Sequence, residues 1–344
     1  MTNSRAAYDD ISAELLKYGP EDLHELIAEA LNDLIENHID IDVGIGKIAP
    51  LEKPKKPMPC PPKDLRPIIL LKVIRKVLSK ISLTRLKPKF EDYLSPSQCA
   101  YRNNRSTTDA IWAYRWILAK VQEERIVIFV TGIDMSAAFD TIIRSILMAI
   151  IDEIGGEDEG RMARILLSDT KLEVRIPGFE GRFIFQSNRG SPQGDSLSGP
   201  LFTVYFERAL RNVREEIEHT PPEEDHPYTT YINPRIDTPQ VDNDHSYQSA
   251  PGAQEPPPEI TFADDMDHLT TNESVQNKFL EAVSEILESF GLLVNNGKTE
   301  KTILKRGERE TELWRNVVKL GNCLGDIEDI ARRKQLTSMA FTKM

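Results

Sequence analysis

The sequence predicts a mixed α+β fold. Residues 23–35 and 275–290 place apolar side chains at the three- and four-residue spacing of amphipathic helices. Residues 260–269 and 171–186 each consist of two short strand-like runs around a turn. Residues 126–133 form an uninterrupted apolar run typical of a buried strand. Helices and hairpins therefore alternate along one chain.

Composition limits the class of protein. The 344 residues suffice for one large domain or two to three small ones, and 40% are hydrophobic. No run approaches the roughly 20 apolar residues of a membrane span. The polar N-terminus lacks a signal peptide core, and Cys60, Cys99 and Cys323 are too scattered for a disulfide framework or a zinc site. We therefore expect an intracellular protein, nuclear or cytoplasmic, without a membrane partner.

The N-terminal region predicts a helix and then a connector. Pro20, Glu21 and Asp22 form a favourable helix start, because proline suits the first turn and acids suit the positive end of the helix dipole. Residues 47–62 contain six prolines and are expected to be an extended connector.

Residues 63–89 are basic although the whole chain has a net charge of −12. The net charge alone argues against a nucleic-acid partner. This segment, however, contains one acid, Asp64, and nine basic residues: Lys63, Arg66, Lys72, Arg75, Lys76, Lys80, Arg85, Lys87 and Lys89. A helix over 70–86 would interleave these charges with apolar residues. The charged side of this helix could be an ordinary solvated face. The excess of basic over acidic residues supports a phosphate-facing surface at least as well.

A second basic site precedes a predicted helix start. Ser106 and Asp109 form the Ser-x-x-Asp pattern of a capping box, and the helix continues through residues 111–121. Arg102 and Arg105 lie just before this N-terminus. Two guanidinium groups beside the positive end of a helix would suit a polyphosphate.

Acidic residues lie at two strand ends. The strand 126–133 runs into Asp134, and Asp264 and Asp265 form the tip of the 260–269 hairpin. An isolated Asp-Asp pair is most often a solvated turn. If the two strands pair in one sheet, however, three carboxylates converge and suit Mg²⁺, which prefers oxygen ligands. Two such ions can clamp an in-line displacement at phosphorus.

The remaining segments complete the pattern. Residues 189–200 form a glycine-rich loop that leads into a helix, and its glycines let the backbone approach a flat ligand such as a base pair. Residues 219–258 are poor in apolar residues and are predicted to be a disordered insertion. A strand and turn over 292–300, a short strand at 317–320 and a helix at 327–339 end the chain.

Seven motifs in order resemble the reverse transcriptase domain of non-LTR retrotransposons, over about residues 60–341. Each motif alone is weak, but their shared order is specific. They are Leu65-Arg66-Pro67-Ile68-Ile69-Leu70-Leu71, Tyr101-Arg102 to Asp109, Asp134 to Asp140, Ser191-Pro192-Gln193-Gly194 to Phe202, Phe262-Ala263-Asp264-Asp265, Gly291 to Glu300, and Lys319-Leu320-Gly321.

The resemblance implies a right-hand polymerase with fingers and palm, an antiparallel palm sheet packed on helices, and a largely absent thumb. The implied divisions are an N-terminal helical extension at 1–46, the connector at 47–62, fingers with the start of the palm at 63–133, the palm at 134–325 and a truncated thumb at 326–344. No room is expected for an endonuclease ahead of the chain.

The resemblance further implies an RNA-directed DNA polymerase, which uses dNTPs to extend a DNA primer on an RNA template with two Mg²⁺ ions, or Mn²⁺ in their place. The implied catalytic and metal-binding residues are Asp134, Met135, Asp264, Asp265 and Lys298, the last as proton donor to pyrophosphate. The implied nucleotide-binding residues are Lys63, Arg66, Arg102, Phe139, Gln193 and Gly194, with Phe139 as the gate against a 2′-hydroxyl. The implied template or primer contacts are Lys72, Arg75, Lys76 and Arg105.

The chain departs from the family's pattern after Gln-Gly, and two alternative functions stay open. A small or apolar residue is common after Gln-Gly in the family, whereas Asp195 here is expected to add negative charge near the template. Net acidity and the missing thumb favour an inactive, truncated or domesticated polymerase-fold protein that binds nucleic acid or protein. An RNA-dependent RNA polymerase is disfavoured by Phe139, because a bulky gate excludes ribonucleotides.

Overall fold

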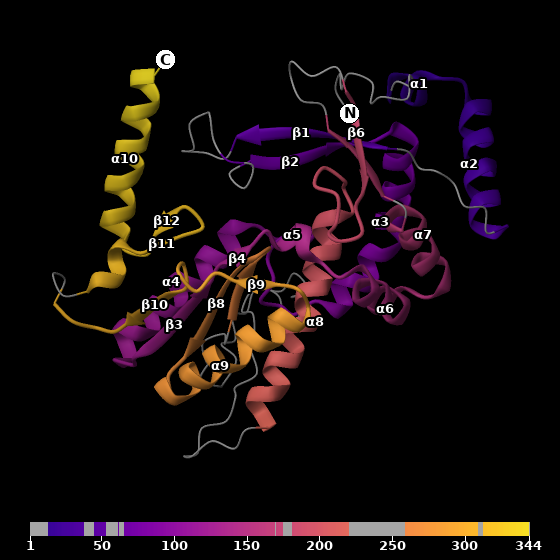
Figure 1. Ribbon diagram of the computed structural model, residues 1–344. Helices are drawn as coiled ribbons and strands as arrows, with labels where there is room; N and C mark the ends of the chain where they lie inside the picture. Colours follow the sequence, from indigo (N-terminus) through magenta and orange to yellow (C-terminus); the bar gives the residue numbers. More distant parts are fainter. Residues whose placement is uncertain are drawn as a thin grey trace, which may run out of the picture. The chain divides into compact units, whose positions relative to one another are not determined.

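The computed structural model describes residues 13–37, 45–52, 61, 65–168, 170–174, 181–219, 259–308 and 312–343. The predicted mixture of helices and sheets is confirmed (Figure 1). The chain divides into two compact units. The first unit comprises Met1–Leu94, Ala137–Arg208 and Phe290–Leu292, and the second comprises Ser95–Ser136, Ala209–Ser289 and Leu293–Met344. Lys63 and residues 220–258 of the predicted insertion lie outside the described residues.

The first unit contains a four-stranded sheet of order β2-β1-β5-β6. Strand β1 (Gly46–Glu52) is antiparallel to β2 (Leu65–Leu70), and β5 (Lys171–Val174) is antiparallel to β6 (Phe183–Gln186), which confirms the second predicted hairpin. A parallel contact at Gly46 joins β1 to β5.

Residues 46–52 form a paired strand that overlaps the start of the extended connector expected at 47–62. Proline lacks the N–H that a sheet ladder requires. In the structure Pro50 faces Pro67 across the β1–β2 pair, so both missing donors fall at the same rung of the ladder.

Helices form the rest of the first unit. The predicted N-terminal helix is confirmed as α2 (Glu21–Glu36), and a short α1 (Ala13–Tyr18) precedes it. Helix α3 (Val73–Tyr93) contacts α6 (Arg144–Gly155) and α7 (Glu157–Leu167). A short α5 (Ala138–Thr141) precedes α6. Helix α8 (Ser198–His219) begins after the glycine-rich loop, and its residues from Ala209 onward belong to the second unit.

The second unit is built on a fully antiparallel sheet of order β10-β3-β8-β7. Strand β3 (Ile128–Ile133) lies between β8 (Asp265–Thr270) and β10 (Glu300–Leu304), and β7 (Glu259–Phe262) pairs with β8 as the predicted hairpin. Two small strand pairs accompany it. Strand β4 (Met135–Ser136) pairs with β9 (Leu293–Val294), and β11 (Val318–Lys319) pairs with β12 (Asn322–Cys323).

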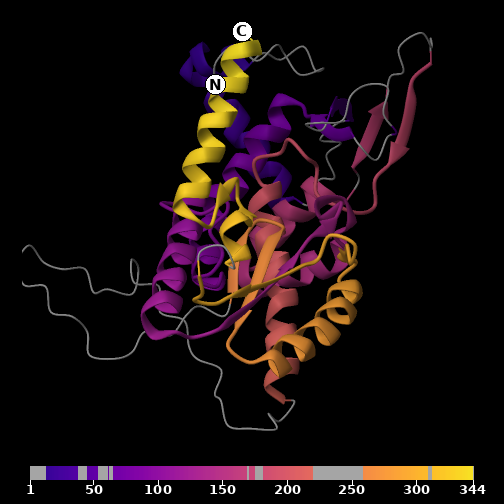
Figure 2. The same ribbon diagram turned by 90° about the vertical axis from the view of Figure 1, so that its left-hand side faces the viewer.

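Helices cover both faces of this sheet (Figure 2). Helix α4 (Thr107–Glu124) begins at the predicted capping box of Ser106 and Asp109. Helix α9 (Glu273–Ser289) lies on the other face, where Gln276 donates to Thr131 over 2.8 Å. Successive strand residues point to opposite faces, so Val130 faces α4 while its neighbour Thr131 faces α9.

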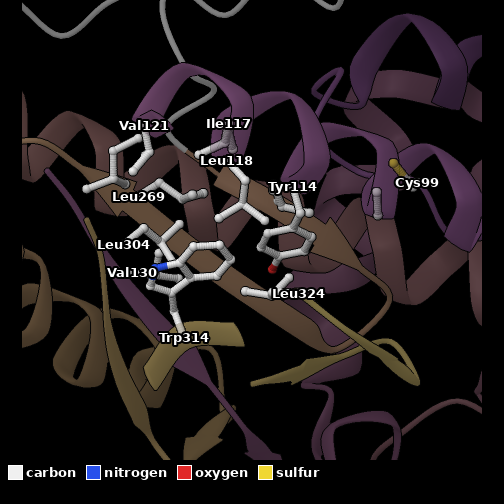
Figure 3. Packing of buried hydrophobic residues seen from close by; sticks show 13 residues of the cluster. Cys99, Tyr114, Ile117, Leu118, Val121, Val130, Leu269, Leu304, Trp314 and Leu324 are labelled. Atoms are coloured by element: carbon white, nitrogen blue, oxygen red, sulfur yellow. The ribbon is translucent and has the colours of Figure 1, made fainter. Parts of the chain in front are cut away.

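The core of the second unit lies between α4 and the sheet (Figure 3). Tyr114, Ile117, Leu118 and Val121 from α4 pack with strand residues such as Val130 and with Trp314 from the 3₁₀ helix η3 (Leu313–Asn316). The last helix is α10 (Asp326–Lys343). Among the described helices, none combines the length and the apolar character needed to span a bilayer.

Candidate active site

Strand register in the second unit brings the three predicted acids to one end of the sheet. Ile133, the last residue of β3, pairs with Met266 of β8. Because the strands are antiparallel, the next residue, Asp134, comes level with Asp265. Phe262 pairs with Asp265 across the hairpin, which leaves Ala263 and Asp264 at its tip.

The charges of these acids act on one another. Burial raises the pKa of Asp264, and the charge of Asp134 raises it further. Burial also raises the pKa of Asp265, followed by the charges of Asp264 and Asp134. The like charges of these carboxylates therefore disfavour one another's ionised form. In the part of the chain that the structure describes, however, no three His, Cys, Asp or Glu side chains form a closed metal-ligand set.

Lys298 lies beside Asp134. Its Nζ is 3.1 Å from Oδ2 of Asp134. The turn before β10 holds it there: the Asn295 amide donates to the carbonyl oxygen of Asp134 over 2.8 Å, and the Lys298 amide donates to the carbonyl of Asn295 over 2.9 Å. The side chain of Met135 is buried.

A cavity of about 440 Å³ adjoins the acids and is lined by Asp134, Asp265, Lys298, Lys319 and Asp267, among others. Asp267 was not predicted as a site residue. It is buried, it accepts a hydrogen bond from the Tyr114 hydroxyl, and its Oδ1 lies 2.8 Å from Nζ of Lys319. The sequence did contain a signal for Asp267: it follows Asp265 by two residues, and this spacing places both acids on the same strand face.

A glycine makes space for the buried pair of Asp267 and Lys319. Gly132 pairs with Asp267 in the sheet. A Cβ atom at Gly132 would lie 2.6 Å from Oδ1 of Asp267 and 2.9 Å from Nζ of Lys319. The charged groups of Asp267 and Lys319 therefore occupy the space that a side chain at position 132 would need.

The arginines ahead of α4 bind backbone oxygens. Arg102 donates to the carbonyl of Ser95 over 2.7 Å, and Arg105 donates to that of Pro96 over 3.0 Å. Tyr101 immediately precedes Arg102, and its pKa is raised first by burial and then by the charge of Asp264. Sequence reasoning did not assign Tyr101 to the site.

The first unit contains other predicted nucleotide-binding residues. Phe139 stacks on Phe202 with ring centroids 4.4 Å apart, and its carbonyl accepts the Ser191 amide over 2.9 Å. Gln193 donates to Asp140 over 3.0 Å, and its carbonyl accepts the Ile69 amide over 2.6 Å. The glycine-rich loop thus lies against α5 and β2, and Arg66 is exposed on β2.

Gly194 allows this loop to approach β2 closely. Its φ is +118°, and a Cβ atom there would lie 2.6 Å from the carbonyl oxygen of Ile69. A side chain at this position is therefore excluded both by backbone conformation and by space.

The structure corrects the predictions for Arg75 and Asp195. Arg75 is 1% exposed, donates to the carbonyl of Leu166 over 2.5 Å and lies 3.7 Å from Oδ2 of Asp195, so it does not belong to a phosphate-facing surface. Asp195 accepts from Ser79 over 2.8 Å and faces this buried arginine rather than an open site. The helix also begins at Val73 and extends beyond 86. Lys72 and Lys76 are partly exposed.

Comparisons with known proteins agree on one family. Residues 53–325 match the family described as reverse transcriptase (RNA-dependent DNA polymerase). The Retrovirus-related Pol polyprotein from type-1 retrotransposable element R2 of Popillia japonica is 26% identical over 246 residues, which cover 69% of this chain and 29% of the polyprotein.

Solved structures resemble the fold. Apo telomerase from Candida tropicalis, truncated from its C-terminal domain, matches with a TM-score of 0.51 and 15% identity, over 88% of this chain and 59% of that one. Telomerase from Candida albicans with the TWJ fragment of telomeric RNA matches with a TM-score of 0.49 and 14% identity, over 82% and 46%. The chain thus spans less than two thirds of each of these relatives.

Proposed function

The chain belongs to the reverse transcriptase (RNA-dependent DNA polymerase) family, in the non-LTR retrotransposon type that its ordered motifs predicted, and we propose that it extends a DNA primer on an RNA template with dNTPs. The observation that carries the proposal is the register of the second unit, which sets Asp134 level with Asp265. In this proposal the sheet β10-β3-β8-β7 is the palm sheet, and β1 and β2 belong to the fingers.

The chemistry of the acids supports the proposal of a divalent-cation site. Asp134, Asp264 and Asp265, with the carbonyl oxygen of Met135, offer oxygen atoms only, which is the donor set that Mg²⁺ and Mn²⁺ prefer. The pKa values of Asp264 and Asp265 are raised first by burial and then by the charges of the neighbouring acids, and a bound cation would offset both effects. When bound, two such ions supply Lewis-acid stabilisation of the charge that develops at phosphorus.

Lys298 is suited to hold a proton at this site. Its ammonium group lies against Asp134 yet is 66% exposed, so it is open to an anionic ligand. We propose that it donates its proton to departing pyrophosphate, since a lysine positioned within hydrogen-bond reach can serve as a general acid.

The first unit is proposed to hold the nucleotide. Phe139 is fixed by its stack on Phe202, which suits a rigid wall under a deoxyribose. The backbone of Gln193 and Gly194 is fixed against Ile69, which suits a platform for the new base pair. In the first unit, Arg66 is proposed as a nucleotide-binding residue, and Lys72 and Lys76 as template or primer contacts. In the second unit, considered by itself, Arg102 is proposed as a nucleotide-binding residue and Arg105 as a template or primer contact.

One observation favours the second candidate, a polymerase-fold protein that binds nucleic acid without extending it. Arg102 and Arg105 already donate to backbone carbonyls of the loop before them. They would have to exchange these contacts to bind phosphate.

Primer extension on poly-rA/oligo-dT with Mg²⁺ or Mn²⁺ distinguishes the two candidates. We expect the wild type to extend the primer and Asp264→Asn to be at least about a hundredfold slower, as for loss of a charged transition-state contact. Asp92→Asn, an isosteric change on an exposed part of α3, is the control and should be as active as wild type. A wild type that binds the duplex without extension would support the second candidate, and an active Asp264→Asn would contradict the assignment of the acids.

A further inference from the structure

Gln98 is a buried side chain that holds the Asp264–Asp265 turn. It is 3% exposed, and its partners on the turn lie 165 residues away in the sequence. Oε1 accepts the Ala263 amide over 3.1 Å and the Ala100 amide over 2.9 Å, while Nε2 donates to the carbonyl of Ala263 over 3.4 Å. One carboxamide therefore binds both the backbone that carries Asp264 and the backbone that leads to Tyr101.

Backbone pairing on either side of Gln98 aligns these two segments. The Thr261 amide donates to the carbonyl of Ser97 over 3.2 Å, and the Cys99 amide donates to the carbonyl of Thr261 over 2.9 Å. Gln98 and Thr261 form a parallel bridge along the free edge of β7. The loop thus extends the sheet as far as the acidic turn.

Both segments then turn through a conformation that most residues avoid. Ala263 has φ +57° and Tyr101 has φ +57°, in the left-handed region that usually requires glycine. Such residues persist where the surrounding structure over-determines them, often at functional sites. Gln98 is the side chain that bonds to the backbone at Ala263 and immediately before Tyr101.

We propose that Gln98 is a positioning residue for the acids. Its carboxamide fixes the left-handed turn at Ala263, and so sets where Asp264 stands relative to Asp134 and Tyr101. The role in catalysis rests on the proposed polymerase function, but the control of the turn does not.

The test replaces Gln98 with methionine, which keeps the length of the side chain and removes its hydrogen bonds. Gln98→Glu retains an oxygen for both amides and loses only the long Nε2 bond to the Ala263 carbonyl, so it should keep most of the turn. Gln276→Met is the matched control, because Gln276 is also buried in the second unit but bonds to Thr131 on the face covered by α9.

Hydrogen exchange of the peptide over residues 259–266 is the primary readout. In Gln98→Met we expect the turn amides to exchange at least about tenfold faster, as when a buried acceptor is lost, with β3 unchanged. Gln98→Glu should stay within about threefold of wild type. Unchanged exchange in Gln98→Met, or equal acceleration in Gln276→Met, would overturn the proposal.

Mn²⁺ affinity and primer-extension kinetics extend the test to the acids. Gln98→Met should bind Mn²⁺ at least about tenfold more weakly, as for loss of a group that orients metal ligands. It should lower kcat with KM for dNTP within about twofold, because the reacting geometry changes and the nucleotide contacts do not. A wild type without polymerase activity would contradict the proposed function, while hydrogen exchange would still decide the role of Gln98.

Discussion

Replacing Lys319 with methionine tests the buried charge pair beside the acids. Nζ of Lys319 lies 2.8 Å from Oδ1 of Asp267, and the two side chains are 13% and 6% exposed. Removing one partner of a buried pair costs about 3–5 kcal/mol, because the other charge is left without compensation. Since Tyr114 still donates to Asp267, we expect the lower end, about 3 kcal/mol at pH 7.

The cost of Lys319→Met should depend on pH with a defined sign. Burial raises the pKa of Asp267 above its unfolded value, and Lys319 opposes that shift. A raised carboxyl pKa destabilises the fold as pH rises through it, and the penalty vanishes below the unfolded pKa of about 3.9. Losing Lys319 enlarges this penalty, so the free-energy cost of the mutation should shrink between pH 7 and pH 4.5.

Urea unfolding followed by circular dichroism at both pH values measures this cost. Adding Asp267→Asn to Lys319→Met should recover much of the loss, because no charge then remains buried. Lys301→Met, at an exposed lysine of β10, should change the free energy of unfolding by less than about 0.5 kcal/mol. A cost below about 1 kcal/mol at pH 7, or the same cost at both pH values, would show that Lys319 does not compensate a buried charge on Asp267.

Three further substitutions test other parts of the account. Phe139→Ala should lower the ratio of dNTP to rNTP incorporation at least about tenfold, equivalent to ~1.4 kcal/mol, and an unchanged ratio in an active enzyme would place the gate elsewhere. Gly194→Ala should destabilise the fold by about 1–3 kcal/mol, because of its φ of +118° and the 2.6 Å approach to Ile69, and an unaltered melting temperature would contradict this. Ser106→Ala should lower the free energy of urea unfolding by about 1 kcal/mol, because the capping box is lost. An unchanged free energy would show that packing alone holds the start of α4.

Local chemistry made much of the fold predictable. The capping box of Ser106 and Asp109 located the start of α4, because its hydrogen bonds join residues three apart. The Asp264–Asp265 hairpin followed from two short strand-like runs around a turn. The apolar run before Asp134 indicated a buried strand, which is central in the sheet. Strand pairing then sets Asp134 level with Asp265, at strand ends that the sequence had located.

Features set by distant partners were not predictable. Strand β10 is only Glu300–Leu304, and its strand character depends on pairing with β3. Arg75 looks like its basic neighbours in sequence, yet Asp195 and the Leu166 carbonyl satisfy it in the interior. Gln98 lies between ordinary residues, and its role depends on a turn far along the chain.

Binding of Mn²⁺, measured from the electron paramagnetic resonance signal of the free ion, tests most directly whether the acids of the second unit form one divalent-cation site. We expect Asp134→Asn and Asp264→Asn each to weaken the affinity at least about tenfold, and Asp92→Asn to leave it unchanged. Equal affinity in the wild type and both site variants would contradict the shared site, and with it the proposed polymerase chemistry.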